Sequence, residues 1–570
     1  MKRIAFPLLS FFLIMLVCST NAQSLEWAGQ LGGNGSDQPK SIVVNMDGSV
    51  VSTGYFILTT DFDPGAGIFN LTSTGTYNAY ISKLDGGGNF IWAKQFTGNT
   101  TYGHSIAIDS DGNMIITGSF RGTADFDPGP GTFNLNAPSN YDIFITKLDS
   151  GGNFLWAKQI IGPDLDQGNA VITDPNNNIF ITGYFRDTCD FDPGSGTVFL
   201  NSTDNTNEAF ILKLDSGGNF IWANHFGGKS LDEGTGLAID GAGSLYAMGA
   251  FSDTSIFYTA SSIDTLISSG IIDIYIAKFN NTGVLMWLNQ LGGAGLDEGH
   301  SIAVDQMANI YTTGYFNNTA DFDPGSGIYS LTSSGSAEVF VSKIDSAGNF
   351  IWAKQIGGVS NEDCHSLALD ANSNVYLTGN FDGTADFDPG ISNFNMTSIA
   401  SNDIFITKLD TDGNFTWARQ LGGSLNDYGR GIAVDSFTNV FVTGTFMNTV
   451  DFDPDSGIYN LTTAGSNDVF ILKLSDNTTG ITEGFSMNSI ASAYPNPFED
   501  HFSIFNLEAL KNISSIQLSD LYGKHVKCNP VVDFSSNSIH IDNLSNLSKG
   551  IYFLNISNKY NQINLKLIKN

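Results

Sequence analysis

The segment that decides the fold is Phe350-Ile351-Trp352-Ala353-Lys354-Gln355-Ile356-Gly357-Gly358, because close copies of it recur along the chain. Each copy contains one of the seven tryptophans, which are Trp27, Trp92, Trp156, Trp222, Trp287, Trp352 and Trp417. The spacings between them are 65, 64, 66, 65, 65 and 65 residues. A constant period of this length is typical of repeat proteins, in which each unit packs on its neighbours.

One repeat contains four short runs of β-branched and aromatic residues. After the tryptophan segment come Ser366–Asp370, Val375–Phe381 and Asp403–Asp410, each bounded by Gly, Asn, Asp or Pro. Such runs predict β-strands, and no stretch has the 3.6-residue apolar period of a helix. Four strands repeated seven times over residues 23–476 predict an all-β fold, a seven-bladed β-propeller of four-stranded blades. The alternative is a right-handed solenoid with turns of about 65 residues.

The two ends of the repeat region indicate that the ring is closed. The region begins with a lone tryptophan strand, Leu25–Ala28, and its last repeat ends on Asp468–Lys473 with no tryptophan strand after it. The run Ser366–Asp370 reads Ser-Ile-Ala-Val-Asp (SIAVD) in the preceding repeat, at Ser301–Asp305. If this SIAVD-type strand is the innermost of each blade, the N-terminal strand completes the last blade. This pairing removes two exposed sheet edges, and it places each tryptophan on an outer strand between neighbouring blades.

The chain is acidic but has enough apolar material for a large core. It carries 57 acidic and 25 basic side chains, a net charge of -32, and 41% of its residues are hydrophobic. Residues 23–492 contain 51 of the acids and 16 of the basic residues, which gives them a net charge of -35. A negative surface repels phosphate backbones, so we expect no nucleic acid partner.

The N-terminus has the pattern of an export signal over residues 1–22. Lys2 and Arg3 precede an apolar stretch, Ile4–Val17, and Thr20-Asn21-Ala22 offers a cleavage site before Gln23. The alternatives are a lipoprotein signal that uses Cys18, or a buried N-terminal helix. The apolar stretch is too short to span a bilayer, and we expect no transmembrane span in the mature chain.

The cysteines predict no disulfide framework. With Cys18 lost in the signal, Cys189, Cys364 and Cys528 remain, an odd number without metal-like spacing. Cys189 and Cys364 occupy repeat positions that hold Ala or Gly elsewhere, so we expect small buried side chains there.

The repeat resembles a known propeller family. Trp352–Gly358, followed by Leu367–Asp370 and the strand Tyr376–Gly379, resembles the bacterial seven-bladed propeller repeat of SBBP type. The resemblance covers about 455 residues. It implies the propeller fold and no single activity.

The C-terminal part resembles a different family. Tyr494–Phe498, Leu518–Lys524, Leu547–Leu554 and Leu565–Asn570 are similar, in order, to the motifs of the type A C-terminal sorting domain of the type IX secretion system. This resemblance implies a small β-sandwich over residues 493–570, after a linker at 477–492, that the type IX machinery recognises as its partner. It also implies a Gram-negative host of the Bacteroidota type and a protein that is extracellular or held on the outer-membrane surface.

The repeated loop Asp-Phe-Asp-Pro-Gly is a candidate Ca²⁺ site. Carboxylates two residues apart on an extended segment point the same way, and Ca²⁺ prefers oxygen ligands. The candidate ligands are Asp61, Asp63, Asp125, Asp127, Asp190, Asp192, Asp321, Asp323, Asp386, Asp388, Asp451 and Asp453. The alternative is that Asp-Pro-Gly is only a tight turn. The sequence does not identify the further oxygens that Ca²⁺ needs.

Seven polar residues at one repeat position are candidates for a ligand site at the channel mouth. They are Lys40, His104, Asn169, Thr235, His300, His365 and Arg430. Three residues before six of them lies an acid: Asp37, Asp166, Asp232, Asp297, Glu362 and Asp427. By the symmetry of the repeat, both sets should ring one mouth. The three histidines are a candidate metal group, although His104 is not adjacent to the other two. The alternative is solvated loops whose acids accept backbone hydrogen bonds.

The sequence identifies no catalytic residue and no cofactor. It contains no HExxH, no GxSxG and no P-loop. We therefore expect a monomeric, secreted or surface-displayed module that binds a glycan or protein without catalysis, in adhesion or as a scaffold. The alternatives are an extracellular carbohydrate-active hydrolase or lyase that acts at the propeller mouth, and a disc that serves mainly as a spacer.

Overall fold

The computed structural model describes residues 22–258 and 263–477 and, beyond these, the segments 492–494, 500–505, 515–520, 525–526, 529–533, 538–542, 544, 547–557 and 562–569. Two compact units are present, Asn21–Asn477 and the C-terminal part from Thr478. The predicted signal segment up to residue 21, Cys18, Cys528 and all but the ends of the predicted linker lie outside the described residues. The boundaries expected from the sequence stay predictions.

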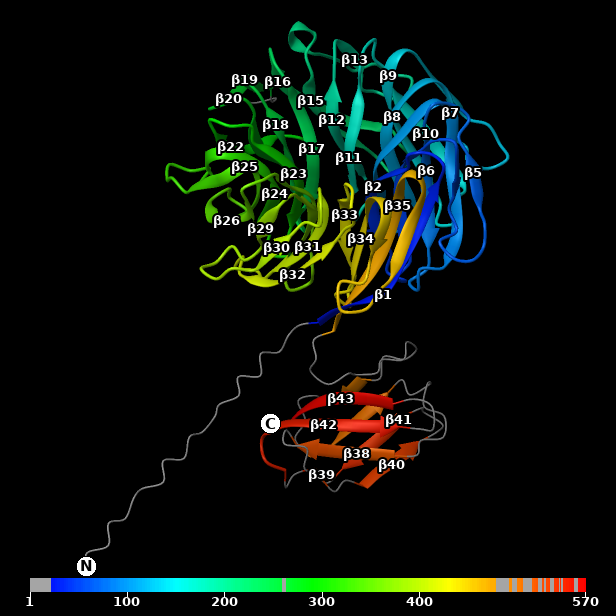
Figure 1. Cartoon of the computed structure of the whole chain (residues 1–570), viewed down its shortest axis with the longest axis vertical. Helices are drawn as coiled ribbons and strands as arrows, with labels where there is room; N and C mark the ends of the chain where they lie inside the picture. The colour runs from blue at the N-terminus through cyan, green and yellow to red at the C-terminus, as the bar shows by residue number, and fades with distance from the viewer. Residues whose placement is uncertain are drawn as a thin grey trace, which may run out of the picture. The chain divides into compact units, whose positions relative to one another are not determined.

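The larger unit is all-β and propeller-like, as Figure 1 shows. Its strands pair antiparallel in successive groups of four. The first two groups are β2 (Gln38–Val44), β3 (Val50–Phe56), β6 (Asn78–Leu84) and the start of β7 (Phe90–Ile108), and then the end of β7, β8 (Met114–Asp125), β9 (Asn134–Leu148) and β10 (Phe154–Ile160). The next two are β11 (Gln167–Thr173), β12 (Ile179–Phe185), β15 (Glu208–Leu214) and β16 (Phe220–Gly228), and then β17 (Asp232–Ile239), β18 (Leu245–Phe251), β21 (Asp273–Phe279) and β22 (Leu285–Gly293). Two more are β23 (Glu298–Val304), β24 (Ile310–Asp321), β25 (Ser330–Ile344) and β26 (Phe350–Gly358), and then β27 (Glu362–Leu369), β28 (Val375–Phe381), β31 (Asp403–Leu409) and β32 (Phe415–Leu421).

The remaining group joins the two ends of the repeat region. It consists of β33 (Tyr428–Val434), β34 (Val440–Asp451), β35 (Asn460–Asn477) and β1 (Ala22–Gly33). The predicted pairing of the N-terminal strand with the last repeat is confirmed, because β1 runs antiparallel to β35 from Ala22 opposite Asn477 to Leu31 opposite Val469. In Figure 1 the blue β1 lies beside the orange β35.

Short strands extend the groups at the Asp-Phe-Asp-Pro-Gly loops and at their counterpart in the fourth repeat. They are β4 (Thr59–Asp61), β5 (Asn70–Thr72), β13 (Thr188–Asp190), β14 (Phe199–Asn201), β19 (Thr254–Tyr258), β20 (Ile263–Ile267), β29 (Thr384–Asp386) and β30 (Asn395–Thr397). Elsewhere the ends of β8, β9, β24, β25, β34 and β35 make the same pairing. The helix found in the described part of the chain is one 3-10 turn, η1 (Thr203–Asn205).

The inner strands form a closed circle of contacts. β2 contacts the second half of β7, which contacts β11, and the series continues through β17, β23, β27 and β33 back to β2. These are the SIAVD-type strands, so the small residues of that segment lie where the sheets approach one another most closely. One core cluster also contains residues from both ends of the repeat region, including Leu31, Phe62, Tyr80, Phe441 and Ile471.

Six of the seven tryptophans dock their repeat on a glycine of the next. Trp27 Nε1 donates to the carbonyl oxygen of Gly86 (3.1 Å), in the turn before the fourth strand of the following repeat. A Cβ atom on Gly88, whose φ is +81°, would lie 2.5 Å from the Trp27 ring, so glycine is required there. The same contact pairs Trp92 with Gly152, Trp156 with Gly218, Trp222 with Gly283, Trp287 with Gly348 and Trp352 with Gly413. The prediction that the tryptophans lie between neighbouring repeats is confirmed.

The C-terminal unit contains two four-stranded sheets. One consists of β36 (Ser492–Tyr494), β37 (Phe502–Phe505), β41 (Ser538–Asp542) and β40 (Asn529–Asp533). The other consists of β39 (His525–Val526), β38 (Ser515–Asp520), β42 (Gly550–Ser557) and β43 (Gln562–Lys569). Ile504 and Ile539 of the first sheet and Leu518 and Leu554 of the second are buried.

Candidate functional site

All seven residues predicted for the channel mouth line one cavity of about 240 Å³. Lys40, His104, Asn169, Thr235, His300, His365 and Arg430 share its wall with the residues that follow them, such as Ser41, Ser105, Ser301 and Ser366. Because these residues belong to β2, β7, β11, β17, β23, β27 and β33, the cavity is the central channel, and the SIAVD-type strands are the innermost.

A β-bulge aims each of these side chains. The pairing between β2 and β3 shifts register between Pro39 and Ser41, and the same shift recurs at the corresponding residue of every other inner strand. The extra residue of a bulge drops out of the ladder and its side chain turns away from the sheet. The chain thus presents one polar side chain to the channel from each repeat, of five different residue types in all.

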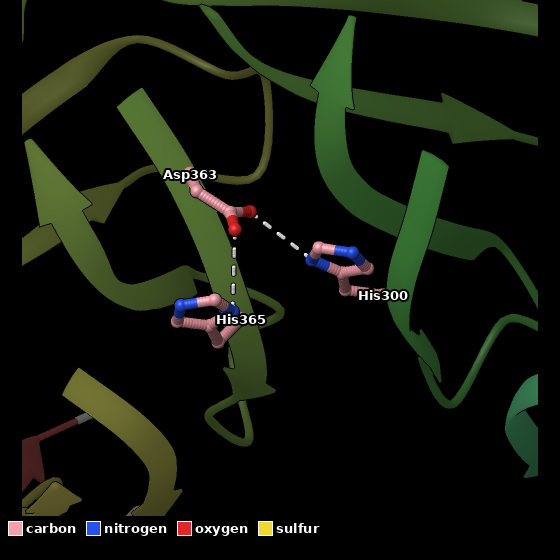
Figure 2. A group of neighbouring side chains, drawn as sticks. All are labelled: His300, Asp363 and His365. Carbon is pink, nitrogen blue, oxygen red and sulfur yellow. Dashed lines mark ion pairs between the residues drawn. The ribbon is translucent and has the colours of Figure 1, made fainter. Parts of the chain in front are cut away.

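Two histidines and an aspartate meet on one side of this channel (Figure 2). Nδ1 of His300 lies 3.1 Å from Oδ1 of Asp363, and Nδ1 of His365 lies 3.5 Å from Oδ2 of the same carboxylate. The two imidazole rings stack with their centroids 5.7 Å apart. The side chains of His300, Asp363 and His365 are 21%, 26% and 16% exposed. This is a group of three potential metal ligands that the channel reaches.

The far sides of the two rings are also hydrogen-bonded. Nε2 of His300 lies 3.4 Å from Oε2 of Glu298, and Nε2 of His365 lies 3.0 Å from Oδ1 of Asn380. Arg430 contributes the nearest cation, with NH1 2.9 Å from Nε2 of His365.

The charges of the cluster shift the pKa values of its members. Burial lowers the pKa of His300, but the carboxylates of Asp363 and Glu298 outweigh burial and raise that pKa to about 10. Burial alone would raise the pKa of Asp363, but the positive charges of His300 and Arg430 beside it hold that pKa well below its usual range. Burial lowers the pKa of His365 to about 3. His300 and Asp363 therefore form an ion pair, while His365 stays neutral.

Sequence reasoning missed Asp363 and Glu298. Symmetry directed attention to the acids three residues before each channel residue, whereas these two lie two residues before it. Residues two apart on a strand share a face, so the position of His365 already contained the signal. The other residues at this position are Gln38, Tyr102, Gln167, Glu233 and Tyr428.

The acids expected at the mouth are instead buried in the sheets. Asp37, Asp166, Asp232, Asp297, Glu362 and Asp427 are 0–1% exposed. Asp297, for example, accepts hydrogen bonds from the backbone N–H groups of Asn317 (3.0 Å) and Gly293 (2.8 Å). Burial raises their pKa values to between about 6 and about 8. These acids connect the outer and inner strands of one repeat. They accept backbone hydrogen bonds, as the alternative interpretation predicted, but they do so as buried side chains and not in solvated loops.

Tyrosines form a second pocket beside the cationic part of the channel. This pocket, of about 460 Å³, is lined by Lys40, Tyr55, Tyr102, His104, Ser119, Tyr141, Leu165, Gln167 and Tyr184. The ring centroids of Tyr55 and Tyr102 are 4.8 Å apart, and Tyr77 lies 5.3 Å from both. Lys40 Nζ lies 5.8 Å from the centre of the Tyr55 ring, and burial, aided by the charge of Arg430, lowers the pKa of Lys40 to about 8.

A third pocket, rich in amides and acids, adjoins the histidine cluster. It measures about 430 Å³ and is lined by Leu296, Tyr315, Asn317, Ser336, Ala337, Asn361, Glu362, Asp363, Asn380, Asp382 and Asn402. Asp363 and Asn380 belong both to this pocket and to the surroundings of the cluster. The mouth is therefore aromatic and cationic on one side and acidic on the other.

The aspartates of the Asp-Phe-Asp-Pro-Gly loops are engaged within their own loops. Oδ1 of Asp321 accepts from the N–H groups of Asp323 (3.0 Å) and Tyr329 (2.8 Å), and Oδ1 of Asp323 accepts from Gly325 (2.9 Å). The phenylalanine between them, Phe322, is fully buried, as it is in each of the other copies. Within residues 22–258 and 263–477, the structure gathers none of the twelve predicted Ca²⁺ ligands into a group of three or more. The loop hydrogen bonds favour the turn as the reason for the motif.

Both described cysteines are free and buried, as predicted. Sγ of Cys189 donates to Oδ2 of Asp166 (3.2 Å), and Sγ of Cys364 contacts the carbonyl oxygen of Thr378 (3.5 Å). Burial raises the pKa of each thiol, to about 12 for Cys364, so neither is an activated nucleophile.

Two family models match the chain. The beta-propeller repeat, SBBP, matches residues 91–119, 155–184, 351–387 and 416–445, and the secretion system C-terminal sorting domain matches residues 492–570. The chain therefore contains SBBP-type propeller repeats and a type IX C-terminal sorting domain, as both resemblances predicted. Such a sorting domain implies recognition by the type IX machinery and export to the cell surface or the extracellular space.

Two curated proteins are similar over part of the chain. An uncharacterized WD repeat-containing protein of Acanthamoeba polyphaga mimivirus is 26% identical over 511 residues, which cover 75% of this chain and 36% of that protein. The regulatory protein FlaEY of Caulobacter vibrioides is 27% identical over 127 residues, which cover 22% of this chain and 13% of that protein. The chain thus spans about a third of the length of the first relative and about an eighth of the second.

Among solved structures, YCF48 bound to D1 peptide matches with a TM-score of 0.34 and 10% identity, over 80% of this chain and 96% of that chain. No helix in the described part of this chain combines the length and the apolar character that crossing a bilayer requires.

Proposed function

We propose that this chain is an exported, non-catalytic binding protein in which a ring of seven four-stranded blades, residues 23–476, holds a ligand at the mouth of its central channel. A linker at 477–492 joins the ring to a sorting domain at 493–570, a small β-sandwich that directs the protein to the outer-membrane surface or the extracellular space. The groups of four strands, the circle of inner-strand contacts and the match to the sorting domain support this organisation.

The observation that carries the binding function is that the residue type at the bulge position differs between repeats. The position after the bulge holds only Ser, Ala or Gly in the seven repeats, whereas the bulge residue itself is Lys, His, Asn, Thr, His, His or Arg. All seven line one cavity. A scaffold without a ligand has no need for five different polar residue types at one position of a channel, so this variation favours recognition of an asymmetric ligand.

The chemistry of the mouth favours a saccharide. The tyrosine pocket offers aromatic faces on which sugar rings can pack, and hydroxyl, amide and ammonium groups for sugar hydroxyls surround it. Its volume of about 460 Å³ lies within the range of small-molecule sites. Lys40 and Arg430 give the same side a positive charge, which favours a saccharide with acidic groups.

A glycan array with the full-length protein tests this proposal. We expect retention of acidic oligosaccharides, and a loss of at least tenfold in affinity for Tyr102→Ala. The matched control is Tyr329→Ala, which removes a 40% exposed tyrosine on a loop remote from the channel residues. Equal losses in both variants, or no retention of any glycan, would contradict the proposal. Cleavage of the oligosaccharides during incubation would show instead that the protein is a hydrolase or lyase that acts at the mouth.

A further inference from the structure

The histidine cluster of the channel has the chemistry of a transition-metal site. Two imidazole nitrogens and one carboxylate oxygen lie within 4.8 Å of one another. In a tetrahedral site with bonds of 2.0–2.2 Å, neighbouring ligand atoms are about 3.3 Å apart. The ligand atoms of His300, Asp363 and His365 must therefore approach one another by up to about 1.5 Å to form such a site. Imidazole and carboxylate ligands suit Zn²⁺ and its first-row neighbours.

The hydrogen bonds behind the two rings match those of metal-bound histidines. A histidine that ligates through one nitrogen usually donates its other N–H to a carboxylate or carbonyl oxygen. Here Glu298 stands behind Nε2 of His300 and Asn380 behind Nε2 of His365, at 3.4 Å and 3.0 Å. With both protons on Nε2, the Nδ1 atom of each ring is the free ligand atom, and Figure 2 shows both Nδ1 atoms on the side of the Asp363 carboxylate. Nδ1 of His300 also lies 3.1 Å from the carbonyl oxygen of Cys364, and metal binding replaces this contact.

The site also has an open side. The histidines line the central cavity of about 240 Å³, and Asp363 lines the adjoining pocket of about 430 Å³. Three protein ligands with access from a cavity leave a coordination position for water or for an oxygen of a ligand.

We propose that His300, Asp363 and His365 bind a first-row transition-metal dication, with Zn²⁺ as the representative ion, and that Arg430 opposes its binding. The guanidinium lies 2.9 Å from Nε2 of His365, the nitrogen that must carry a proton when Nδ1 ligates. Both the steric conflict between donors and the repulsion between cations require Arg430 to turn away. The positive charge of Arg430 already offsets the negative charge of Asp363, so Arg430 competes with a cation for the site.

Equilibrium titration of the full-length protein with Zn²⁺ and with Co²⁺ tests the site. We expect one tight equivalent and, for Co²⁺, visible absorption bands of a four-coordinate ion. His365→Gln and Asp363→Asn should lose at least tenfold in affinity, and Arg430→Gln should gain about tenfold. The matched control is His104→Gln, which removes another channel histidine from outside the cluster and should bind as the parent does.

The metal affinities of these variants distinguish binding at the histidine cluster from adventitious binding of metal ions by the acidic surface. Unchanged affinity in His365→Gln and Asp363→Asn, absence of a tight equivalent, or weaker binding by Arg430→Gln would overturn the proposal. Thermal melting of each variant without metal identifies any that fails to fold, and for such a variant His300→Gln takes its place. The inference does not depend on the saccharide proposal, because the titration contains only the metal.

Discussion

One repeat position, occupied by tyrosine in some repeats and by isoleucine in the second, shows how the fold supplies a partner to a buried aspartate. In three repeats a tyrosine hydroxyl donates to the aspartate that ends the inner strand, as Tyr246 does to Asp240 (2.9 Å). In the second repeat Ile115 occupies the tyrosine position and has no hydroxyl. There Lys147, which faces Ile115 across the ladder, pairs with Asp109 at 2.8 Å, with both side chains almost fully buried. The cation replaces the missing donor.

Lys147→Met should therefore destabilise the protein by about 3 kcal/mol at pH 7, because it leaves the carboxylate of Asp109 buried without its partner. Burial opposes ionisation of Asp109, but Lys147 and Asn113 hold its pKa below the usual value. Its contribution is present above pH 4 and is lost as the pH falls through the native pKa, so the difference should shrink in acid. Urea unfolding at pH 7 and pH 3 measures both effects.

The matched control for this variant is Lys278→Met. Lys278 occupies the same position in the fourth repeat and donates to the carbonyl oxygen of Ser346 (2.9 Å), while Tyr246 serves the aspartate there. We expect a loss of about 1 kcal/mol. Equal losses in the two variants would contradict the role assigned to Lys147.

The tryptophan contact between repeats is the second residue-scale prediction. Trp287→Ala removes the packing on Gly348 and the hydrogen bond from Nε1 to Ser346 (3.2 Å), and we expect a loss of about 3 kcal/mol. Calorimetry measures the shift in Tm. Phe437→Ala, at a 71% exposed position, is the control and should change stability by less than about 0.5 kcal/mol. A Tm of Trp287→Ala equal to that of the parent would refute the docking role.

The residues of the channel illustrate what sequence alone could predict. The seven bulge residues follow from the repeat, because equivalent positions lie at equivalent places in a ring. The place of Asp363 follows from the strand period, two residues before His365, but its contact with His300 does not, since that histidine lies on the adjacent repeat. Contacts between unlike residues of adjacent units have no periodic signal.

At the scale of elements, the Asp-Phe-Asp-Pro-Gly loop is a self-contained cap on each repeat. The glycine pair after the tryptophan strand pairs with the loop, as Gly32 does with Asp61. The buried phenylalanine anchors the loop, and the two aspartates close it by accepting backbone N–H groups. The sequence predicted four strands per repeat and a turn here. It did not predict the added two-stranded ribbon, because runs of three residues are too short to carry a period of two.

Because these loops are closed by their own hydrogen bonds, we expect Ca²⁺ added to the EDTA-treated protein to leave the Tm of the repeat region unchanged. Asp321→Ala should cost about 1–2 kcal/mol, since two backbone donors lose their acceptor. Asp321→Asn keeps an Oδ1 acceptor and is the matched control, with a smaller loss. A drop in Tm with EDTA that Ca²⁺ restores would establish the calcium site instead. Differential scanning calorimetry with and without 5 equivalents of Ca²⁺ per loop, roughly the excess needed at micromolar affinity, makes the comparison.

For the whole molecule, the acidity divides into surface and interior. Six carboxyls that connect inner and outer strands have pKa values raised by burial: to about 6 for Asp297, about 7 for Asp37 and Asp427, and about 8 for Asp166, Asp232 and Glu362. Near neutral pH part of the interior acid is therefore protonated. The effective charge of residues 23–492 is smaller in magnitude than the formal -35.

Stability should consequently fall as the pH rises. A carboxyl whose native pKa is raised binds its proton more tightly in the folded state, so its contribution is full below pH 4 and is lost as the pH passes through 6 to 8. Burial lowers the pKa values of His104 and His365 to about 3, so these histidines are neutral in the folded state. Their contribution to stability is lost as the pH falls below 6.5, which opposes the effect of the carboxyls. We expect maximal stability near pH 5–6 and a loss of about 3 kcal/mol or more by pH 8.5. Urea unfolding at constant ionic strength measures the profile; stability that rises from pH 6 to 8.5 would refute it.

The pairing of β1 with β35 sets the order of events in a newly made chain. The strand that emerges first is needed last, because its partner is made more than 400 residues later. Until then β1 is a solitary edge, and the last repeat cannot be finished. Long-range closure of this kind is slow, since the chain loses the entropy of a long loop before it gains any contact. The final fold of the repeat region therefore cannot exist until the whole region has been made, and the sorting domain, translated after β35, becomes available only once the closing strand is.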